Sequence, residues 1–503
     1  MSNPNFTPAG INGLILEEKL LWEKGRKGRE AMSVVKSDAP KASLPAELAG
    51  SGPDWPDLSE LEVARHYTRL STWNFGIDTG MYPLGSCTMK YNPIINENMA
   101  ALPGFAGAHP LLPAEASQGS MQLIFELEKY LAEIVGLKEA SMQPAAGAHG
   151  ELCGMLMIAA YHRNNEKSGA PKKTKVLMPD TSHGTNPATA TMCGFTELKV
   201  PLGPKGYIEL AEIGKLMADD VAGLMITNPN TLGLFEQELT DIITLIHERG
   251  GLVYADGANL NAVMGYADLG KMGVDVVHYN LHKTMSTPHG GGGPGAGPVA
   301  VSDALVPYLP GPRIVKSGSK YEWNNDLPLS IGRLHGFHGQ FGVGVKAYSY
   351  IRSMGKDLKK ASALAVLNAN YIKEKLKDAF DLPFDEPCMH ECVFTDAKQR
   401  ANKVSTLDIA KRLIDFGFHP PTVFFPLVVN SAIMIEPTET ESKEELDGFI
   451  AAMLEIAREA QENPDQLHAA PTLTKVRRMD ETTAARQPVL TGDMTANSAG
   501  GAK

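Results

Sequence analysis

The chain has few cysteines, no long apolar run and no surplus of positive charge. Five cysteines are scattered over 503 residues, which argues against a disulfide framework and suits a reducing cytoplasm. No apolar run approaches the roughly 20 residues of a membrane span, and the N-terminus lacks the pattern of a secretory signal. The net charge of −11 argues against a nucleic-acid or anionic-membrane surface. We therefore expect a cytoplasmic protein that binds neither nucleic acid nor membrane.

Four regions are predicted along the chain. Prolines interrupt the first region, where only residues 14–22 and 59–67 have the pattern of short helices. The last region is polar and is also punctuated by proline. The predicted regions are an N-terminal arm at 1–75, a large domain at 76–338, a smaller C-terminal α+β domain at 339–463 and a C-terminal tail at 464–503.

The large region alternates between strands and helices. Residues 117–135 and 239–249 have apolar residues at helical spacing. Six short apolar segments have the pattern of buried strands, namely residues 175–178, 196–200, 223–227, 252–255, 274–277 and 297–301. Such alternation predicts an α/β fold with a mainly parallel sheet and helices on both faces.

The pattern changes after residue 306. Residues 307–339 are rich in proline, glycine and serine and are predicted to be loops. A long helix is predicted from residue 344 towards 380, with Gly355 as a break. Beyond it, the predicted strands are residues 392–394, 424–429 and 432–435, and the predicted helices are residues 406–416 and 443–462.

Several loops follow apolar segments, at the ends where ligands bind in open α/β sheets. Residues 145–150 place small side chains before a helix, which suits a phosphate on free backbone N–H groups as well as it suits a tight turn. His183 follows one strand and is placed to lie against a ring, although a lone histidine is more often structural. Asn228 follows another strand and is placed to meet a cofactor hydroxyl, although Asn-Pro is also an ordinary turn.

Asp256 and Lys283 are the strongest signal in the chain. Asp256 ends one apolar strand, and Lys283, 27 residues later, follows a second. Enzymes that use pyridoxal phosphate need a lysine that bonds to the cofactor aldehyde and an aspartate that pairs with the protonated pyridine nitrogen. A lysine beside a glycine-rich loop at the end of a buried strand has little structural purpose. The pair therefore predicts a pyridoxal phosphate site.

Two rival motifs are weaker. The glycine run at 290–297 is followed by neither Gly-Lys-Ser/Thr nor a helix, so it is neither a nucleoside triphosphate loop nor a dinucleotide fingerprint. Cys388 and Cys392 enclose a histidine and a glutamate, but four potential ligands in five residues close poorly on one tetrahedral ion. We therefore expect no metal.

The amino-acid sequences of several longer segments closely resemble those of one protein family. The matching segments are residues 81–93 (MYPLGSCTMKYNP), 143–151 (QPAAGAHGE), 183–188 (HGTNPA), 280–284 (NLHKT), 288–295 (PHGGGGPG) and 435–439 (IEPTE). They resemble the glycine decarboxylase P-protein of the glycine cleavage system, over about residues 13–490. The P-protein is often one chain of about twice this length, built from two homologous halves. This chain is similar to the C-terminal, cofactor-carrying half, which some bacteria make as a separate subunit 2.

The resemblance implies a fold-type I pyridoxal phosphate enzyme and a reaction. Glycine's amine displaces Lys283 from the cofactor, CO2 leaves, and the aminomethyl group passes to the lipoyl arm of H-protein. Asp256 keeps the pyridine nitrogen protonated. His183 stacks on the ring, and His282 either moves protons or packs. The phosphate candidates are Ala146, Gly147 and Thr284. The implied partner is subunit 1, with two copies of each chain in a heterotetramer.

One departure from the fold-type I pattern concerns the substrate carboxylate. Many such enzymes hold it with an arginine in the small domain, whereas residues 432–436 offer none. An absent ion pair suits a carboxylate that must leave as CO2. The alternatives are another fold-type I enzyme, of aldolase or desulfurase type, and a cofactor-free scaffold subunit. A desulfurase needs a nucleophilic cysteine after the lysine, where only Cys388 and Cys392 occur, and the Asp256–Lys283 pair argues against a scaffold.

Overall fold

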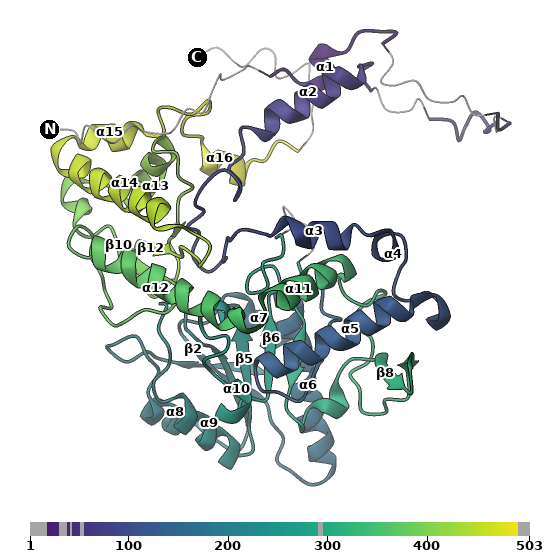
Figure 1. Cartoon of the computed structure of the whole chain (residues 1–503). Helices are drawn as coiled ribbons and strands as arrows, with labels where there is room; N and C mark the ends of the chain where they lie inside the picture. Colours follow the sequence, from purple (N-terminus) through teal and green to yellow (C-terminus); the bar gives the residue numbers. More distant parts are fainter. Residues whose placement is uncertain (1–17, 30–37, 41–42, 51–54, 290–294, 491–503) are drawn as a thin grey trace.

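The computed structural model describes residues 18–29, 38–40, 43–50, 55–289 and 295–490 (Figure 1). Its centre is a seven-stranded sheet in the order β1-β7-β6-β5-β4-β2-β3, in which only β7 runs against its neighbours. The strands are β1 (Glu139–Ser141), β2 (Lys175–Pro179), β3 (Thr196–Val200), β4 (Val221–Thr227), β5 (Leu252–Gly257), β6 (Val276–Tyr279) and β7 (Val299–Val301). The predicted mainly parallel sheet is confirmed.

Helices cover both faces of this sheet because its central strands are apolar on both sides. In β4, Leu224 and Ile226 belong to one hydrophobic core, while Ala222 and Met225 belong to the other. The first core is closed by α5 (Ala114–Ile134), α9 (Leu239–Glu248) and α11 (Phe341–Met354), and the second by α6 (Gly147–Lys167) and α7 (Thr185–Met192). Strands buried on both faces are typical of parallel sheets.

A second, antiparallel sheet has the order β10-β12-β11 and its own core. Its strands are β10 (Cys392–Thr395), β11 (Thr422–Val423) and β12 (Ala432–Ile435), packed with α12 (Leu358–Leu376), α13 (Thr406–Asp415) and α14 (Lys443–Glu462). Gly355, with a φ of 49°, separates α11 from α12 as predicted. α11 packs on the first core, whereas the end of α12 packs on the core of the small sheet. The domain limits at 76, 339 and 464 stay predictions.

Two local predictions are wrong. Residues 424–429 were predicted as a strand, but they form a loop in which Phe424 has a φ of 60° and Pro426 lacks an N–H to donate. Within the predicted loops at 307–339, β8 (Arg313–Ser317) and β9 (Lys320–Asn324) form a hairpin, which turns at Gly318 with a φ of 61°. The surrounding glycine and proline residues obscure its short alternation in the sequence.

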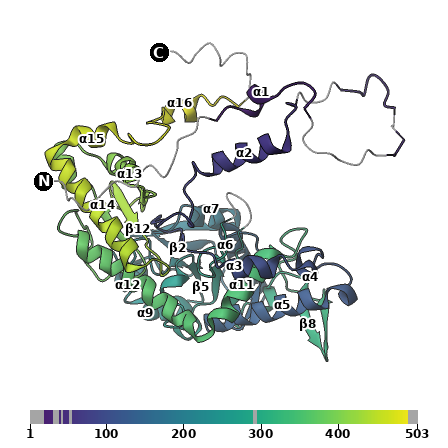
Figure 2. The ribbon, with the colours of Figure 1, turned by 45° about the horizontal axis from the view of Figure 1, so that its top comes forward.

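The arm and the tail contain short helices. The arm has α1 (Leu21–Lys24) and α2 (Glu60–Ser71), and Ser59 caps α2 in a capping box with Glu62. Residues 14–17 of the first predicted helix lie outside the described residues, as do residues 290–294 of the glycine run. Figures 1 and 2 show α1 and α2 standing away from the large sheet.

The remaining helices are short. They are α3 (Ile94–Ala100), α4 (Pro103–Ala106), α8 (Leu210–Leu216), α10 (Leu269–Met272), α15 (Pro464–Ala469) and α16 (Glu481–Arg486). The tail is held to the small sheet's helices by Asp415, which accepts hydrogen bonds from the backbone N–H groups of Thr472 and Leu473 at 2.7 Å each. Among the helices of the described ranges, none is both long and apolar enough to cross a membrane.

Candidate active site

The predicted site residues gather at one edge of the large sheet. β1, β2, β4, β5 and β6 all run in the same direction, so their carboxyl ends lie along that edge. Asp256 lies at the end of β5, and the segments that follow the other four strands carry Gly147, His183, Asn228 and Lys283. The direction of the strands therefore brings these segments to the edge where ligands bind in open α/β sheets, and the roles of the residues stay predictions.

Asp256 is held inside the sheet by its neighbours. It is paired in register with Thr227 of β4 on one side and His278 of β6 on the other. Its Oδ1 accepts a hydrogen bond from the N–H of Ala258 at 2.9 Å and lies 3.5 Å from His278 Nε2. The other ring nitrogen of His278 bonds to the hydroxyl of Tyr254. Burial lowers the pKa of His278, so this histidine orients the carboxylate without neutralising it.

Lys283 lies just beyond β6 in a turn closed by Asn280. The N–H of Lys283 donates to the carbonyl of Asn280 at 2.9 Å. With the Asn280 amide turned so that its oxygen faces the lysine, that oxygen lies 3.2 Å from Lys283 Nζ. The next residue, Thr284, receives a hydrogen bond at its carbonyl from Lys90, whose Nζ also contacts Glu439 at 2.7 Å. Lys90 thus stabilises the turn that contains Lys283.

The start of α6 forms a cradle for an anion. Ala146 has extended backbone angles, and no side chain caps the helix. The first N–H groups of a helix have no intrahelical acceptor and attract phosphate. A Cβ atom on Gly147 would lie 2.4 Å from Asn280 Oδ1, and one on Gly297 would lie 1.9 Å from the carbonyl of Ala146. Glycine at 147 and 297 therefore lets α6 begin directly beside the lysine turn.

Buried polar atoms without partners mark where a ligand is needed. Asn228 uses its Oδ1 to accept from the N–H of Glu236 at 3.0 Å, while its Nδ2 has no partner in the described structure. The hydroxyls of Thr227 and Thr284 are likewise buried and unpaired there. Buried polar groups in native proteins are nearly always hydrogen-bonded. These atoms, with the α6 cradle, Asp256 and Lys283, fit a phosphate-bearing pyridine with a ring hydroxyl.

His183 stands at the mouth of the site. Its residue is exposed, and its Nδ1 lies 2.9 Å from the hydroxyl of Thr185, which also contacts both oxygens of Glu151 at 2.8 and 2.9 Å. Partial desolvation lowers the pKa of His183, and the charges of Asp256 and Lys283 both act on it. Burial and the charge of Asp256 raise the pKa of Glu151 to about 7. Glu151 lies in the segment 143–151 that resembles the family, but nothing in the sequence marks it individually as a site residue.

His282 packs beside the glycine run. A Cβ atom on Gly295 would lie 2.5 Å from His282 Nδ1, so the ring packs against the described end of the glycine run. Burial and the neighbouring His289 lower the pKa of His282 to about 3. The ring is therefore neutral at physiological pH, which favours the packing alternative over proton transfer.

The small sheet contributes a group of buried side chains that the sequence analysis did not predict. In the described residues, His390, Glu391 and Glu436 form a buried group whose ligand atoms lie within 4.8 Å of one another. Cys388 and Cys392, considered as metal ligands from the sequence, are not part of it. At the end of β12, where many fold-type I enzymes have an arginine, this chain has Glu436. Only the strand pairing brings these residues together.

Comparison with known proteins decides the family. The model of the glycine cleavage system P-protein matches residues 33–331, and that of the glycine dehydrogenase C-terminal domain matches residues 361–473. The chain belongs to the glycine cleavage system P-protein family. The predicted resemblance is confirmed, and pyridoxal phosphate, predicted from Asp256 and Lys283, is the cofactor of this family.

Relatives of the subunit 2 type match almost the whole chain. The probable glycine dehydrogenase (decarboxylating) subunit 2 of Listeria innocua is 53% identical over 477 residues, covering 94% of this chain and 97% of the relative. The protein of the same name from Caldanaerobacter subterraneus is 53% identical over 478 residues, covering 94% and 98%. The desulfurase and aldolase alternatives are thereby displaced.

Solved structures confirm the fold. A glycine decarboxylase P-protein in inhibitor-bound form aligns with a TM-score of 0.69 and 21% identity over 82% of this chain and 93% of that chain. A cysteine desulfurase from Escherichia coli aligns with a TM-score of 0.59 and 15% identity, over 76% and 95%. The predicted fold-type I architecture is therefore confirmed.

Gly147→Ala should weaken cofactor binding. The added Cβ atom would meet Asn280 and push the start of α6 away from the lysine turn. We expect the dissociation constant for pyridoxal phosphate to rise at least about tenfold, which corresponds to about 1.4 kcal/mol. Titration of the apoprotein followed by visible absorbance measures it.

Gly119→Ala is the matched control. Gly119 also lies in a helix, but its Cβ position is in open space. It should leave cofactor binding unchanged. If both variants bound pyridoxal phosphate with equal affinity, the start of α6 would not be the phosphate site.

Proposed function

We propose that this chain decarboxylates glycine and passes the aminomethyl group to the lipoyl arm of H-protein, as subunit 2 of a two-subunit glycine dehydrogenase. The single observation that carries the proposal is the placement of Asp256 and Lys283 at the ends of neighbouring parallel strands in a P-protein family member. The cofactor, when bound, supplies a ring that accepts the electron pair freed as CO2 departs.

The chain's own residues hold that ring. Asp256, fixed by Ala258 and His278, holds a proton on the pyridine nitrogen. Lys283 is the amine that would hold the cofactor through its aldehyde. The N–H groups at Ala146 and Gly147, with the free hydroxyl of Thr284, bind the phosphate.

The two remaining contacts orient the ring. The Nδ2 of Asn228, which has no partner in the described structure, would donate to the ring hydroxyl. His183 covers the outer face of the ring, held by Thr185 and Glu151. His282 keeps its packing role against Gly295.

An apolar rim beside His183 supports a role for the lipoyl arm. The ring of Phe425 lies 6.1 Å from that of His183 in edge-to-face contact. In the same loop, Phe424 and Leu427 are exposed, and the Leu427 side chain is 86% accessible. A hydrocarbon arm that ends in a disulfide suits such a rim better than a charged carrier would.

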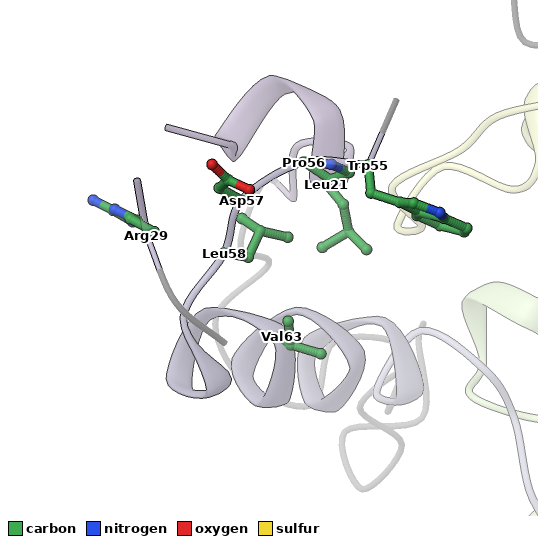
Figure 3. Close-up of a pocket in the computed structure, with 7 residues that line it drawn as sticks. All are labelled: Leu21, Arg29, Trp55, Pro56, Asp57, Leu58 and Val63. Carbon is green, nitrogen blue, oxygen red and sulfur yellow. The ribbon is translucent and has the colours of Figure 1, made fainter. Parts of the chain in front are cut away.

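The arm supports a second chain as partner. Leu20, Trp22, Leu44, Leu48 and Trp55 are large apolar residues that this chain leaves exposed. Figure 3 shows Leu21, Leu58 and Val63 around a pocket on the same arm, which Arg29, Trp55, Pro56 and Asp57 complete. Exposed apolar patches of this kind mark protein interfaces, and subunit 1 is the partner that a P-protein half requires.

The cofactor should be found on Lys283. Borohydride reduction of the purified protein followed by peptide mapping should place the pyridoxyl group on Lys283 Nζ. Lys90 is the internal control, because it is a buried lysine that contacts the same turn through Thr284. A label on Lys90 or on any other lysine makes the assignment wrong.

Asp256→Asn should retain the cofactor but lose most activity. A neutral amide does not hold the pyridinium proton, so the departing electron pair is less well stabilised. We expect glycine–bicarbonate exchange to fall about 100-fold or more, with normal cofactor absorbance.

Asp275→Asn is the control for this variant. Asp275 is a buried aspartate beside the same strands, bonded to the N–H of Val253 and to His247 rather than to site residues. It should keep exchange activity. Near-normal exchange in Asp256→Asn would remove Asp256 from the mechanism.

Co-expression with subunit 1 should give a stable complex of two copies of each chain. Obligate interfaces are large and apolar, so the isolated chain should be less stable. Size-exclusion chromatography with light scattering measures the assembly. Trp55→Ser should weaken it, whereas Tyr266→Ser, which changes an exposed aromatic residue outside the arm, should not. A monomer with full exchange activity and no gain from subunit 1 would refute the two-subunit proposal.

A further inference from the structure

Two glutamates and a histidine of the small sheet form a cluster that the proposed mechanism does not use. Glu391 comes directly before β10 and Glu436 directly after β12, next to the paired residues Cys392 and Ile435. The register therefore sets the two carboxyl groups opposite each other. Glu391, Glu436 and His390 are all completely buried.

The cluster faces the reacting lysine. Burial raises the pKa of Glu391 and Glu436 and lowers that of His390, and the charge of Lys283 acts on all three, opposing the rise at the two glutamates and adding to the fall at the histidine. The loop at 86–88 contacts both sides. The N–H of Ser86 donates to Glu391 and the N–H of Thr88 donates to Glu436, each at 2.8 Å, while the carbonyl of Cys87 bonds at 2.8 Å to the ring of His289, which follows the lysine turn. The cluster thus lies across the site from the large sheet.

The two carboxyl groups are not equivalent. Glu436 accepts three hydrogen bonds, from the N–H of Thr88, from the Thr88 hydroxyl at 2.6 Å and from Asn261 Nδ2 at 3.2 Å. Glu391 accepts one, and its Oε1 has no partner in the described structure. Three donors suit an ionised carboxylate, whereas a free oxygen suits a carboxylic acid whose O–H lacks an acceptor.

Charge repulsion reinforces this asymmetry. Burial, then the nearby charge of Glu436, raises the pKa of Glu391 well above its usual range. Burial also raises the pKa of Glu436, but the hydrogen bonds from Thr88 oppose the shift. Two buried carboxyl groups this close share one proton rather than ionise together.

The other titratable groups nearby stay neutral. Burial lowers the pKa of His390 to about 3, and both of its ring nitrogens are unpaired in the described residues, one lying 3.5 Å from Glu391 Oε2. Burial raises the pKa of Cys87, raises that of Cys388 to about 12, and raises that of Cys392 well above its usual range. The buried Lys90 is the nearby exception, because its Nζ pairs with Glu439 at 2.7 Å.

We propose that Glu391 is a neutral carboxylic acid that donates its proton in the glycine reaction, and that Glu436 is the ionised partner that stores the negative charge. The free oxygen of Glu391, the three donors on Glu436 and their common position opposite Lys283 carry the proposal. The donor role rests on the proposed function, whereas the protonation state of the pair does not.

The proton balance gives Glu391 a defined task. The C–C bond of glycine breaks and CO2 leaves. The freed electron pair forms the bond from the aminomethyl carbon to one lipoyl sulfur, while the S–S electron pair stays on the other sulfur. That sulfur takes a proton from Glu391. Glycine's ammonium group loses one proton as its amine becomes neutral, and this proton restores Glu391. No further oxidant is needed, because the lipoyl disulfide is reduced.

Infrared spectroscopy tests the protonation state directly. At pH 8, glutamates 128, 151, 236 and 441, whose pKa values are each raised by desolvation to about 7, are mostly ionised. The wild-type spectrum minus that of Glu391→Gln should show a carboxylic acid C=O band that shifts on 13C-glutamate labelling. Glu128→Gln, which keeps an acceptor for the N–H of Met142, should give no such band. A wild-type protein without the band overturns the proposal.

Stability separates the two glutamates. Glutamine resembles a neutral carboxylic acid, so Glu391→Gln should leave the thermal midpoint nearly unchanged. In Glu436→Gln an amide NH2 would face hydrogen-bond donors, so the midpoint should fall by several degrees. The reverse order would place the proton on Glu436 and overturn the assignment. A divalent ion retained in stoichiometric amount through dialysis, and lost in His390→Ala, would overturn it as well.

Activity tests the donor role. In the complex with subunit 1, Glu391→Gln should keep the cofactor and the glycine-induced change in its absorbance, yet lower aminomethyl transfer to lipoylated H-protein about 100-fold, and Glu391→Asp should restore part of it. Full transfer by Glu391→Gln overturns the donor role. If the wild-type complex transfers nothing, the proposed function fails and the donor role with it, while the infrared result still decides the protonation state.

Discussion

The site holds more buried acid than buried base, and its arrangement depends on how that excess is neutralised. Asp256, Glu151, Glu391 and Glu436 all lie in the region where the charge of Lys283 acts, and all four are buried. Unpaired charge in a protein interior is strongly unfavourable. Asp256 would pair with the pyridinium nitrogen of the cofactor, and the proposed proton on Glu391 removes the charge of one member of the Glu391–Glu436 pair. The strands position these groups, and the charge balance decides whether each group is protonated or ionised.

The two sheets contribute different kinds of chemistry to this balance. The parallel sheet places the electron-accepting cofactor, because its strands deliver Asp256 and Lys283 to a common edge. The antiparallel sheet brings two carboxyl groups face to face through a single register. The loop at 86–88 bonds to both carboxyl groups and also, through the carbonyl of Cys87, to His289 after the lysine turn, so it connects the small sheet's acid pair with the site.

The sequence predicts the parallel half of this arrangement well and the antiparallel half poorly. Asp256 and Lys283 are recognisable because each follows a short buried strand, which is a local signal. His278 and Glu391 give no such signal, since their roles arise only from strand pairing over long separations. The failed strand at 424–429 shows the same limit, because apolar composition there serves an exposed loop next to His183. His282, adjacent to the lysine in sequence, turns out to pack against Gly295.

Gly355 lies between the helix packed on the first core and the helix that reaches the second. The electrostatic energy between Lys283 and the acid pair falls with distance. Any tilt of the small sheet about this joint therefore alters the proton affinity of groups on both sides. Movement of the small sheet is therefore coupled to the protonation of the acidic groups at the site. A force that separates the two sheets would be measurable as proton uptake or release.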